Sequence, residues 1–171
     1  MILTTTPHPP LLTTLLLTVF ITACAGNPPA PSQQEPSTDA QTVTQAGLSR
    51  AEVVLAALGH LDAPYRYGGL DADGLDCSAL VQRVYRQAGF AHVPRTTSEQ
   101  ARTARRVSSE FLQPGDVLFF AARGNRIDHV GVFIGDGRFI HAPNARGQVR
   151  IEPLASSYWQ PRLRQAGHFF E

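Results

Sequence analysis

Apolar residues recur at helical spacing in one segment near the middle of the chain, "LDCSALVQRVYRQAG" over residues 75–89. The side chains on one face of this segment are Leu80, Val81, Val84, Tyr85 and Ala88. This spacing predicts a helix that buries that face, and Gly89 is typical of a residue just past a helix C-terminus. The helix is expected to begin at Cys77. A thiol at the electropositive end of a helix can have a lowered pKa and react as the thiolate.

Capping motifs predict two further helices. "SRAE" (49–52) is a capping box that opens a helix, and Gly59 is expected to close it. "TTSE" (96–99) repeats the motif and predicts a short polar helix running toward Arg105. The segment between the first two helices, residues 63–76, is dense in Gly and Asp and is expected to be a loop.

The second half of the chain has the composition of β-strands, rich in β-branched and aromatic residues. The predicted strands are "DVLFFA" (116–121), "IDHVGVFIG" (127–135), "RFIHA" (138–142) and "QVRIE" (148–152). Helices followed by consecutive antiparallel strands indicate an α+β domain whose N-terminal helices pack on one face of a small antiparallel β-sheet. The C-terminal aromatic residues expected to complete the core are Tyr158, Trp159, Phe169 and Phe170.

The N-terminal segment (1–24) has the character of a signal peptide. Its apolar run is too short to span a membrane comfortably and ends in small residues. The ending "ITAC" resembles a bacterial lipobox, in which the cysteine, here Cys24, is lipidated and becomes the first mature residue. Ala25, rather than Asp, follows it, and the resemblance therefore implies the outer rather than the inner membrane. Residues 1–10 lack the Lys or Arg usual in a signal peptide, and a retained anchor helix is the alternative.

Composition and charge divide the remainder of the chain. Residues 25–47 are rich in Pro, Ser, Gln and Thr and predict a disordered tether, so the folded domain covers residues 48–171. All 15 basic residues are arginines, and the net charge of +1 indicates no nucleic-acid partner. Six arginines lie between Arg83 and Arg106 and form either a solvated helical face or a surface attracted to an anionic polymer such as a cell wall.

Cysteine and histidine supply the candidate chemistry. With Cys24 lipidated, Cys77 is the only thiol left in an exported domain, and it has no intrachain disulfide partner. Among the 6 histidines, His129 and His141 lie in the predicted strand region on either side of a "GDG" turn (135–137). Both are therefore candidates to act with Cys77.

The type of this turn decides how the two histidines are placed. A three-residue loop at 135–137 sets His141 opposite Gly131, so His129 and His141 share one face of the hairpin, about 7–8 Å apart. A two-residue loop would put them on opposite faces. On the shared face, Gly131 would leave space beside the His129 imidazole. The residues expected on the core face are Val130, Val132 and Ile134.

With both histidines on one face, Cys77 is a nucleophile, His129 its base and His141 the residue that orients the base, as in papain-like hydrolases. The Cys77 backbone N–H and the helix dipole would hold an oxyanion. The competing interpretations are an inert buried cysteine and a zinc site, although the short-spaced ligand pair typical of zinc is missing. Asp128 precedes the base on the same strand and is expected to point to the other face, away from this triad.

Five motifs in order resemble the NlpC-type family of bacterial cell-wall cysteine peptidases. They are "PYRYGG" (64–69), "LDCSALVQRVY" (75–85), "VPRTTSEQ" (93–100), "LQPGDVLFF" (112–120) and "DHVGVFIGDGRFIHA" (128–142). The resemblance implies a papain-like core, with Cys77 as nucleophile, His129 as base and His141 as the third catalytic residue. The family usually has Gly two residues after the cysteine, where this chain has Ala79, which puts the fine geometry there in question.

The resemblance also implies a substrate cleft beside the nucleophile. Its lining positions are Tyr65 (with Tyr67 as the alternative), Asp76, Ser78 and Arg95. Asp76 would suit a cationic group of the substrate, such as an amine. The tyrosines could instead be loop aromatics that pack on the first helix.

The function implied is that of a murein endopeptidase, most similar to the small lipoprotein members of the family. It would hydrolyse amide bonds in peptidoglycan stem peptides or cross-links during wall growth, without a metal or cofactor. We expect a monomer on the periplasmic side of the envelope, anchored through lipid on Cys24 to the outer membrane. The alternatives are a catalytically silent peptidoglycan-binding lipoprotein and an amidase or acyltransferase on the same scaffold.

Overall fold

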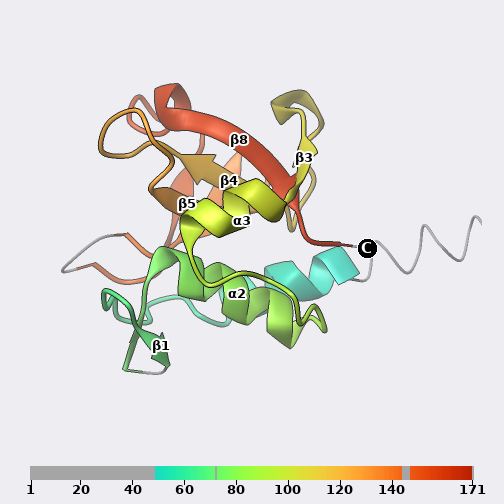
Figure 1. Ribbon diagram of the computed structural model, residues 1–171, viewed down its shortest axis with the longest axis vertical. Helices are drawn as coiled ribbons and strands as arrows, with labels where there is room; N and C mark the ends of the chain where they lie inside the picture. Colours follow the sequence, from blue (N-terminus) through green and yellow to red (C-terminus); the bar gives the residue numbers. More distant parts are fainter. Residues whose placement is uncertain (1–48, 72, 144–146, 171) are drawn as a thin grey trace, which may run out of the picture. The chain divides into compact units, whose positions relative to one another are not determined.

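The computed structural model describes residues 49–170 except positions 72 and 144–146. The predicted signal peptide (1–24), the lipidation site Cys24 and the predicted tether (25–47) lie outside the described residues. Within the described part of the chain, no helix combines the length and apolar character that crossing a membrane requires. The described residues form helices packed against an antiparallel sheet, which confirms the α+β class (Figure 1).

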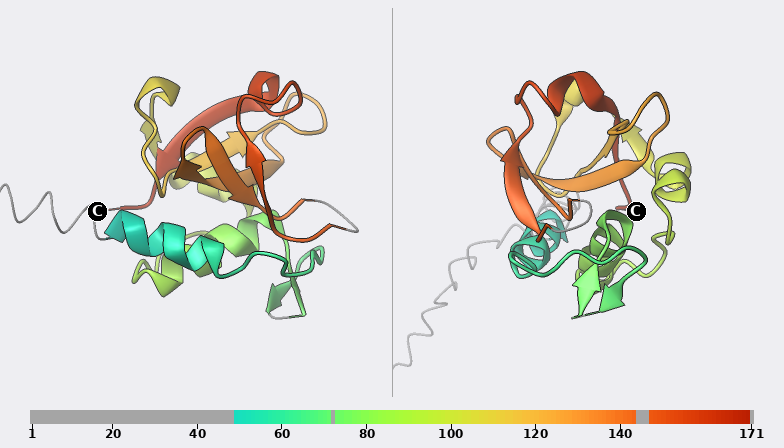
Figure 2. Two further views of the ribbon diagram at one scale, coloured as in Figure 1. Left: turned by 180° about the vertical axis from the view of Figure 1, so that it is seen from behind. Right: turned by 90° about the vertical axis from the view of Figure 1, so that its left-hand side faces the viewer.

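The two helices that flank the core lie where the sequence patterns predict them. The first runs over residues 49–58 and is followed by a turn at Gly59. The second, α2, spans Cys77–Gln87, so it begins at the cysteine as expected. Gly89, just past its end, has φ +90°, a conformation that side chains with a β-carbon rarely adopt. Figure 2 shows these two helices lying beneath the sheet.

The short helix α3 spans Thr97–Thr103 and confirms the second capping box. The Thr96 side chain accepts the Glu99 backbone N–H, and its hydroxyl donates to the Glu99 carboxylate at 2.7 Å. The helix ends before Arg105, which belongs to a strand. Two 3₁₀ turns also occur in the described residues, η1 (Ser109–Phe111) and η2 (Gln160–Arg162).

The main sheet has six strands, all antiparallel, in the order β3–β8–β4–β5–β6–β7. The strands are β3 (Arg105–Val107), β4 (Val117–Phe120), β5 (His129–Gly135), β6 (Arg138–His141), β7 (Arg150–Pro153) and β8 (Leu163–His168). The sequence predicted β4 to β7 but not β3 or β8. Because β8, "LRQAGH", has no β-branched residue, its strand character comes from pairing with β3 and β4 on either side rather than from its composition.

The segment predicted as a loop contains a small hairpin. β1 (Leu70–Asp71) pairs with β2 (Gly74–Leu75) in an antiparallel register. Gly74 has φ +147°, and a β-carbon there would lie 2.5 Å from the β-carbon of Arg66. Glycine is therefore required at this position, and its abundance in the segment marked a tight hairpin rather than irregular structure.

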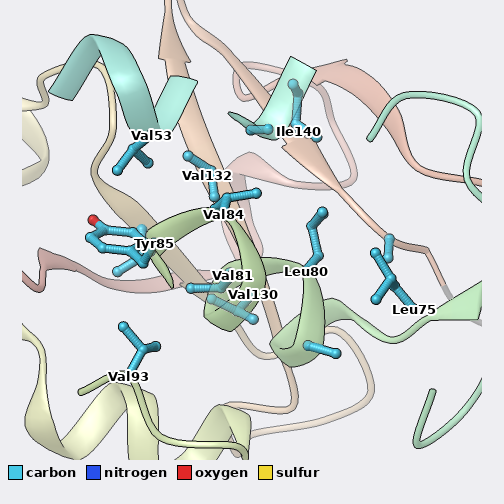
Figure 3. Close-up of a cluster of buried hydrophobic side chains, with 14 of the residues drawn as sticks. Val53, Leu75, Leu80, Val81, Val84, Tyr85, Val93, Val130, Val132 and Ile140 are labelled. Atoms are coloured by element: carbon cyan, nitrogen blue, oxygen red, sulfur yellow. The ribbon is translucent and has the colours of Figure 1, made fainter. Parts of the chain in front are cut away.

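The helix-facing core lies between α2 and β5 (Figure 3). α2 contributes Leu80, Val81 and Val84, which are fully buried. β5 contributes Val130 and Val132, which are also fully buried. Each such side chain contributes about 1.5–3 kcal/mol on burial, so this contact anchors the helix that carries Cys77 at its start.

The opposite face of the sheet carries a second, largely aromatic cluster. Its buried members are Leu118, Phe120, Phe133, Phe139, Trp159 and Ala166. Of the C-terminal aromatic residues expected in the core, Trp159 lies in this cluster, and Phe169 and Phe170 pack in or against the helix-facing core. Tyr158 is 47% exposed, so the expectation was wrong for that residue, because it stacks at the surface on Arg162.

The turn between β5 and β6 has the shorter of the two lengths considered from the sequence. It has two residues, Asp136 and Gly137, both with positive φ. By itself this loop would place the two histidines on opposite faces. However, a bulge at Ile134 adds one residue to β5, so Val132 pairs with Ile140, as a three-residue loop would also require. The turn is thus the two-residue alternative, while the register of the two strands is the one that the three-residue alternative would give.

Candidate active site

Cys77 is the first residue of α2, and the residue before it caps the helix. The Asp76 backbone is extended, and its side chain accepts the Ala79 N–H at 2.8 Å. This N-cap role was not predicted for Asp76. The Cys77 backbone N–H has no partner among the described residues, as is usual in a first helical turn. That N–H is therefore available to an oxyanion.

Three of the predicted substrate-binding residues form one hydrogen-bonded cluster. Arg95 donates to the two Asp76 carboxylate oxygens at 3.0 and 2.7 Å and to the Ser78 hydroxyl oxygen at 2.9 Å. Burial alone would raise the pKa of Asp76, but the hydrogen bonds from Arg95, Ala79 and Ser78 outweigh it and hold the pKa below its ordinary value. The Arg95 side chain is 32% exposed and that of Asp76 12%, so the surface presents more of the guanidinium than of the carboxylate.

The Cys77 thiol is partly buried at the end of the helix. Its sulfur lies 3.6 Å from the Thr97 hydroxyl. Burial raises the pKa of the thiol above its ordinary value, against smaller opposing effects of hydrogen bonds from Thr97 and the Val130 backbone. The shift is therefore opposite to the lowered pKa that a helix N-terminus can produce. Desolvating the thiolate costs more than the helix terminus and these hydrogen bonds recover.

His129 opens β5 and His141 closes β6, and their rings are in contact. Nε2 of His129 lies 2.9 Å from Nδ1 of His141, with the ring planes at 89°. Burial lowers the pKa of His129 to about 3 and that of His141 to about 4. Both rings are therefore neutral at pH 7, and one of them donates its single ring N–H to the other. The contact leaves Nδ1 of His129 free for another partner.

A cleft of about 560 Å³ brings Cys77 and His129 together. The other predicted residues that line it are Tyr65, Asp76, Ser78 and Arg95, and Tyr67 lines it as well. Tyr65 packs against the helix-facing core, whereas Tyr67 is 90% exposed. Every candidate catalytic or substrate-binding residue except His141 thus lies on one cleft, and His141 stands directly behind His129.

A second cavity of about 350 Å³ adjoins the first and shares Arg123, Asp128 and His129 with it. Asp128 accepts the backbone N–H groups of Ala122 and Arg123 at 2.6 and 3.1 Å. This carboxylate therefore holds the loop before β5, and no hydrogen bond joins it to His129. It nevertheless lines both cavities together with His129, rather than lying away from them as expected. The cleft that holds Cys77 therefore adjoins, at His129, the cavity lined by Glu152 and Trp159.

Sequence reasoning missed two residues behind the histidines, Glu152 and Trp159. The Trp159 ring stacks on His129, with centroids 5.2 Å apart and planes at 23°, and its indole N–H donates to Glu152. Glu152 Oε1 lies 3.6 Å from Nε2 of His141. The pairing of the two predicted strands could have pointed to Glu152. His141 pairs with Arg150, and Glu152, two residues further along β7, lies on the same face as Arg150 and therefore beside His141.

The remaining described histidines take no part in the site. His60 bonds to Gln87 at 3.1 Å, and His168 packs on Phe170. His92 lines a separate cavity beside Phe90. Over the described residues, no group of three or more His, Cys, Asp or Glu side chains is arranged to hold a metal ion.

Two positions near the site, Gly131 and Ala79, differ in whether a β-carbon can be accommodated. A β-carbon on Gly131 would lie 2.7 Å from the Phe139 ring and 2.8 Å from the Ile140 carbonyl oxygen. The space expected beside His129 is therefore filled by β6, and glycine is needed for this close approach. Ala79, where the family usually has Gly, is 2% exposed and packs within the helix-facing core.

Comparison with known proteins places this geometry in a family. The sequence matches the NlpC/P60 family over residues 62–168. It is 38% identical over 102 residues to the murein DD-endopeptidase MepS/murein LD-carboxypeptidase of Escherichia coli, which covers 60% of this chain and 53% of that protein. It is 41% identical over 112 residues to a protein of Mycobacterium tuberculosis named probable endopeptidase, which covers 66% of this chain and 28% of that protein. The chain thus spans about half the length of these relatives or less.

A solved structure agrees with this match. The crystal structure of an NlpC/P60 family protein from Bacillus cereus is 31% identical, with a TM-score of 0.66, over 71% of this chain and 40% of that chain. The family match takes in Cys77, His129 and His141 as well as Glu152 and Trp159. More than half of the chain is included, and the protein belongs to the NlpC/P60 family.

Proposed function

We propose that this protein is a cysteine peptidase that hydrolyses amide bonds in the stem peptides or cross-links of peptidoglycan. One observation carries the proposal: Cys77 and His129 line one cleft, while Nε2 of His129 is bonded to His141 and its Nδ1 is free. A nucleophile, a base and a residue that orients the base are the parts that acyl transfer needs. The substrate class is inferred from the similarity to a murein endopeptidase.

The proposed reaction starts from neutral partners. Because burial raises the pKa of Cys77 and lowers that of His129, the thiol is protonated and the imidazole neutral before attack. Nδ1 of His129 takes the thiol proton as the sulfur attacks the scissile carbonyl carbon. The Cys77 N–H and the end of α2 stabilise the oxyanion. His129 returns the proton to the leaving amine, and water then hydrolyses the thioester with His129 again as base.

The substrate is proposed to lie along Tyr65 and the cluster of Asp76, Ser78 and Arg95. The ionised pair formed by Arg95 and Asp76 offers both charges at the cleft, so it suits a zwitterionic group such as an amino acid terminus. Asp76 alone was expected to bind an amine. Its engagement with Arg95 adds a guanidinium that suits a carboxylate.

We further propose that the protein is a monomer on the periplasmic side of the envelope, held at the outer membrane by lipid on Cys24. The "ITAC" sequence supports this placement. Expression of the full chain with and without Cys24→Ala tests it. The wild type should partition into detergent and carry the mass of a diacylglyceryl group, and the variant should do neither. Equal partitioning of the two would contradict lipidation.

Digestion of defined muropeptides tests the activity, with products identified by mass spectrometry. The wild type should release peptide fragments, and Cys77→Ser should lower the rate by at least about 10³-fold, because the hydroxyl is a far weaker nucleophile at neutral pH. The mass of the products identifies the bond. If both proteins bind wall material but neither cleaves it, the protein is a silent binding lipoprotein. Products with a new acyl acceptor would indicate a transferase.

A further inference from the structure

The third residue of the catalytic set has an unexplained buried nitrogen. The His141 side chain is fully buried, and its Nε2 has no hydrogen-bond partner among the described residues. Glu152 Oε1 lies at an ion-pair distance of 3.6 Å from this nitrogen. This separation is longer than the roughly 2.9 Å of a hydrogen bond. Burying a polar N–H without an acceptor is costly. If His141 carries its proton on Nε2, the Glu152 carboxylate that faces this nitrogen is the acceptor available to it.

Glu152 is held in place from two other directions. Arg150 Nε donates to Oε1 at 2.6 Å, and the Trp159 indole N–H donates to Oε2. These contacts keep the carboxylate ionised: burial alone would raise the pKa of Glu152, but the hydrogen bonds and nearby charges lower it overall. Trp159 also stacks on His129. One side chain thus contacts both the base and the carboxylate behind it.

The tautomers of the two histidines depend on one another. For Nδ1 of His129 to accept the thiol proton, its ring proton must sit on Nε2, which then donates to Nδ1 of His141. His141 must in turn carry its own proton on Nε2, the atom that faces Glu152. In the opposite arrangement His141 donates from Nδ1, and the proton of His129 moves to its own Nδ1. That arrangement leaves His129 unable to act as a base toward Cys77.

We propose that Glu152 is a positioning residue which, held by Trp159 and Arg150, fixes the tautomer of His141 and through it that of His129. The inference rests on the roles proposed above for Cys77 and His129. Glu152 does not touch the reacting atoms. It acts across two imidazole rings by being the acceptor toward which the His141 Nε2 proton is directed.

The test uses the full chain and needs no peptidoglycan. The ¹⁵N spectra of the histidine rings report the tautomers, and the rate of Cys77 alkylation by iodoacetamide as a function of pH reports the base. In Glu152→Ala, the protons of both rings should move toward Nδ1, and alkylation at pH 7.5 should slow by about tenfold, part of the usual contribution of a general base. Glu152→Gln, which can still offer one oxygen to His141, should fall between this variant and the wild type.

Matched variants separate positioning from loss of structure. Glu110→Gln neutralises an exposed glutamate in η1, outside the site, so tautomers and alkylation should match the wild type within about twofold. Trp159→Phe keeps a ring against His129 but removes the indole N–H, so it should shift both readouts partway. It also serves as the test if Glu152→Ala does not fold. Unchanged tautomers and alkylation in these Glu152 and Trp159 variants would overturn the inference. Failure on muropeptides with normal tautomers and alkylation would instead count against the proposed function.

Discussion

The two sides of the cleft hold their polar groups in opposite electrostatic states. On the nucleophile side, Asp76 and Arg95 are an ion pair whose hydrogen bonds outweigh the cost of burial. On the base side, His129 and His141 are buried with one hydrogen bond between them, and burial keeps both neutral. The cleft therefore has a fixed ion pair in one wall and neutral rings in the other, and the neutral rings suit the proton transfer proposed above. A neutral imidazole can accept a proton, whereas an imidazolium could not.

The largest expected effect comes from removing the base. His129→Gln should lower kcat/KM on muropeptides by about 10³–10⁴-fold, because general base catalysis and activation of the nucleophile are lost together. His168→Gln, a histidine outside the cleft, should stay within about twofold of the wild type. If the two variants lose activity equally, the proposed difference between His129 and a histidine outside the cleft is wrong.

The second prediction concerns pH and stability. The histidine pKa values of about 3 and about 4 lie below the roughly 6.5 of unfolded histidine, so the unfolded chain binds more protons between these limits. The free energy of unfolding should therefore fall as the pH drops from about 6.5 toward 4, by on the order of several kcal/mol. It should fall again at alkaline pH, where the unfolded thiol ionises before the buried Cys77 does.

Urea unfolding between pH 4 and pH 10 measures this dependence of the unfolding free energy on pH. The double variant His129→Gln with His141→Gln should show a flatter acid limb than the wild type, whatever its stability at pH 7. An unchanged acid slope would mean that the histidines are not held neutral by burial.

Removing the ion pair of Asp76 and Arg95 should lower the stability of the protein. Asp76→Ala removes the N-cap of α2 and leaves Arg95 partly buried without its partner, and should cost about 2–4 kcal/mol of unfolding free energy. Thr96→Ala removes the exposed N-cap of α3 and should cost only about 1 kcal/mol. Denaturant titration of both gives the comparison. Equal losses would show that the pair with Arg95 contributes nothing beyond the cap.

The smallest expected effect lies at the thiol itself. Thr97→Val removes the hydroxyl 3.6 Å from the Cys77 sulfur, which opposes the effect of burial on the thiol pKa. Alkylation at pH 8 should slow by about twofold, since less thiolate is present. Thr103→Val, which removes a hydroxyl further along the same helix, is the control and should leave the rate unchanged. A faster reaction in Thr97→Val would contradict this role of the hydroxyl.

Local sequence determined several elements of this protein directly. The apolar spacing after Cys77 specified the helix α2, and the Thr96 capping box specified the start of α3, because both depend on interactions within a few residues. The order of Cys77, His129 and His141 with their flanking motifs indicated the family, which the comparison over residues 62–168 confirms.

Tertiary structure alone decided the rest. β8 is a strand because two neighbours pair with it, and the bulge at Ile134 corrects the register that the two-residue turn would give. Glu152 reaches His141 only because β7 lies beside β6. The direction of the Cys77 pKa shift follows the same rule. The helix terminus can be read from the sequence, but the burial that outweighs it is a property of the packed molecule, since desolvation depends on every neighbour of the thiol.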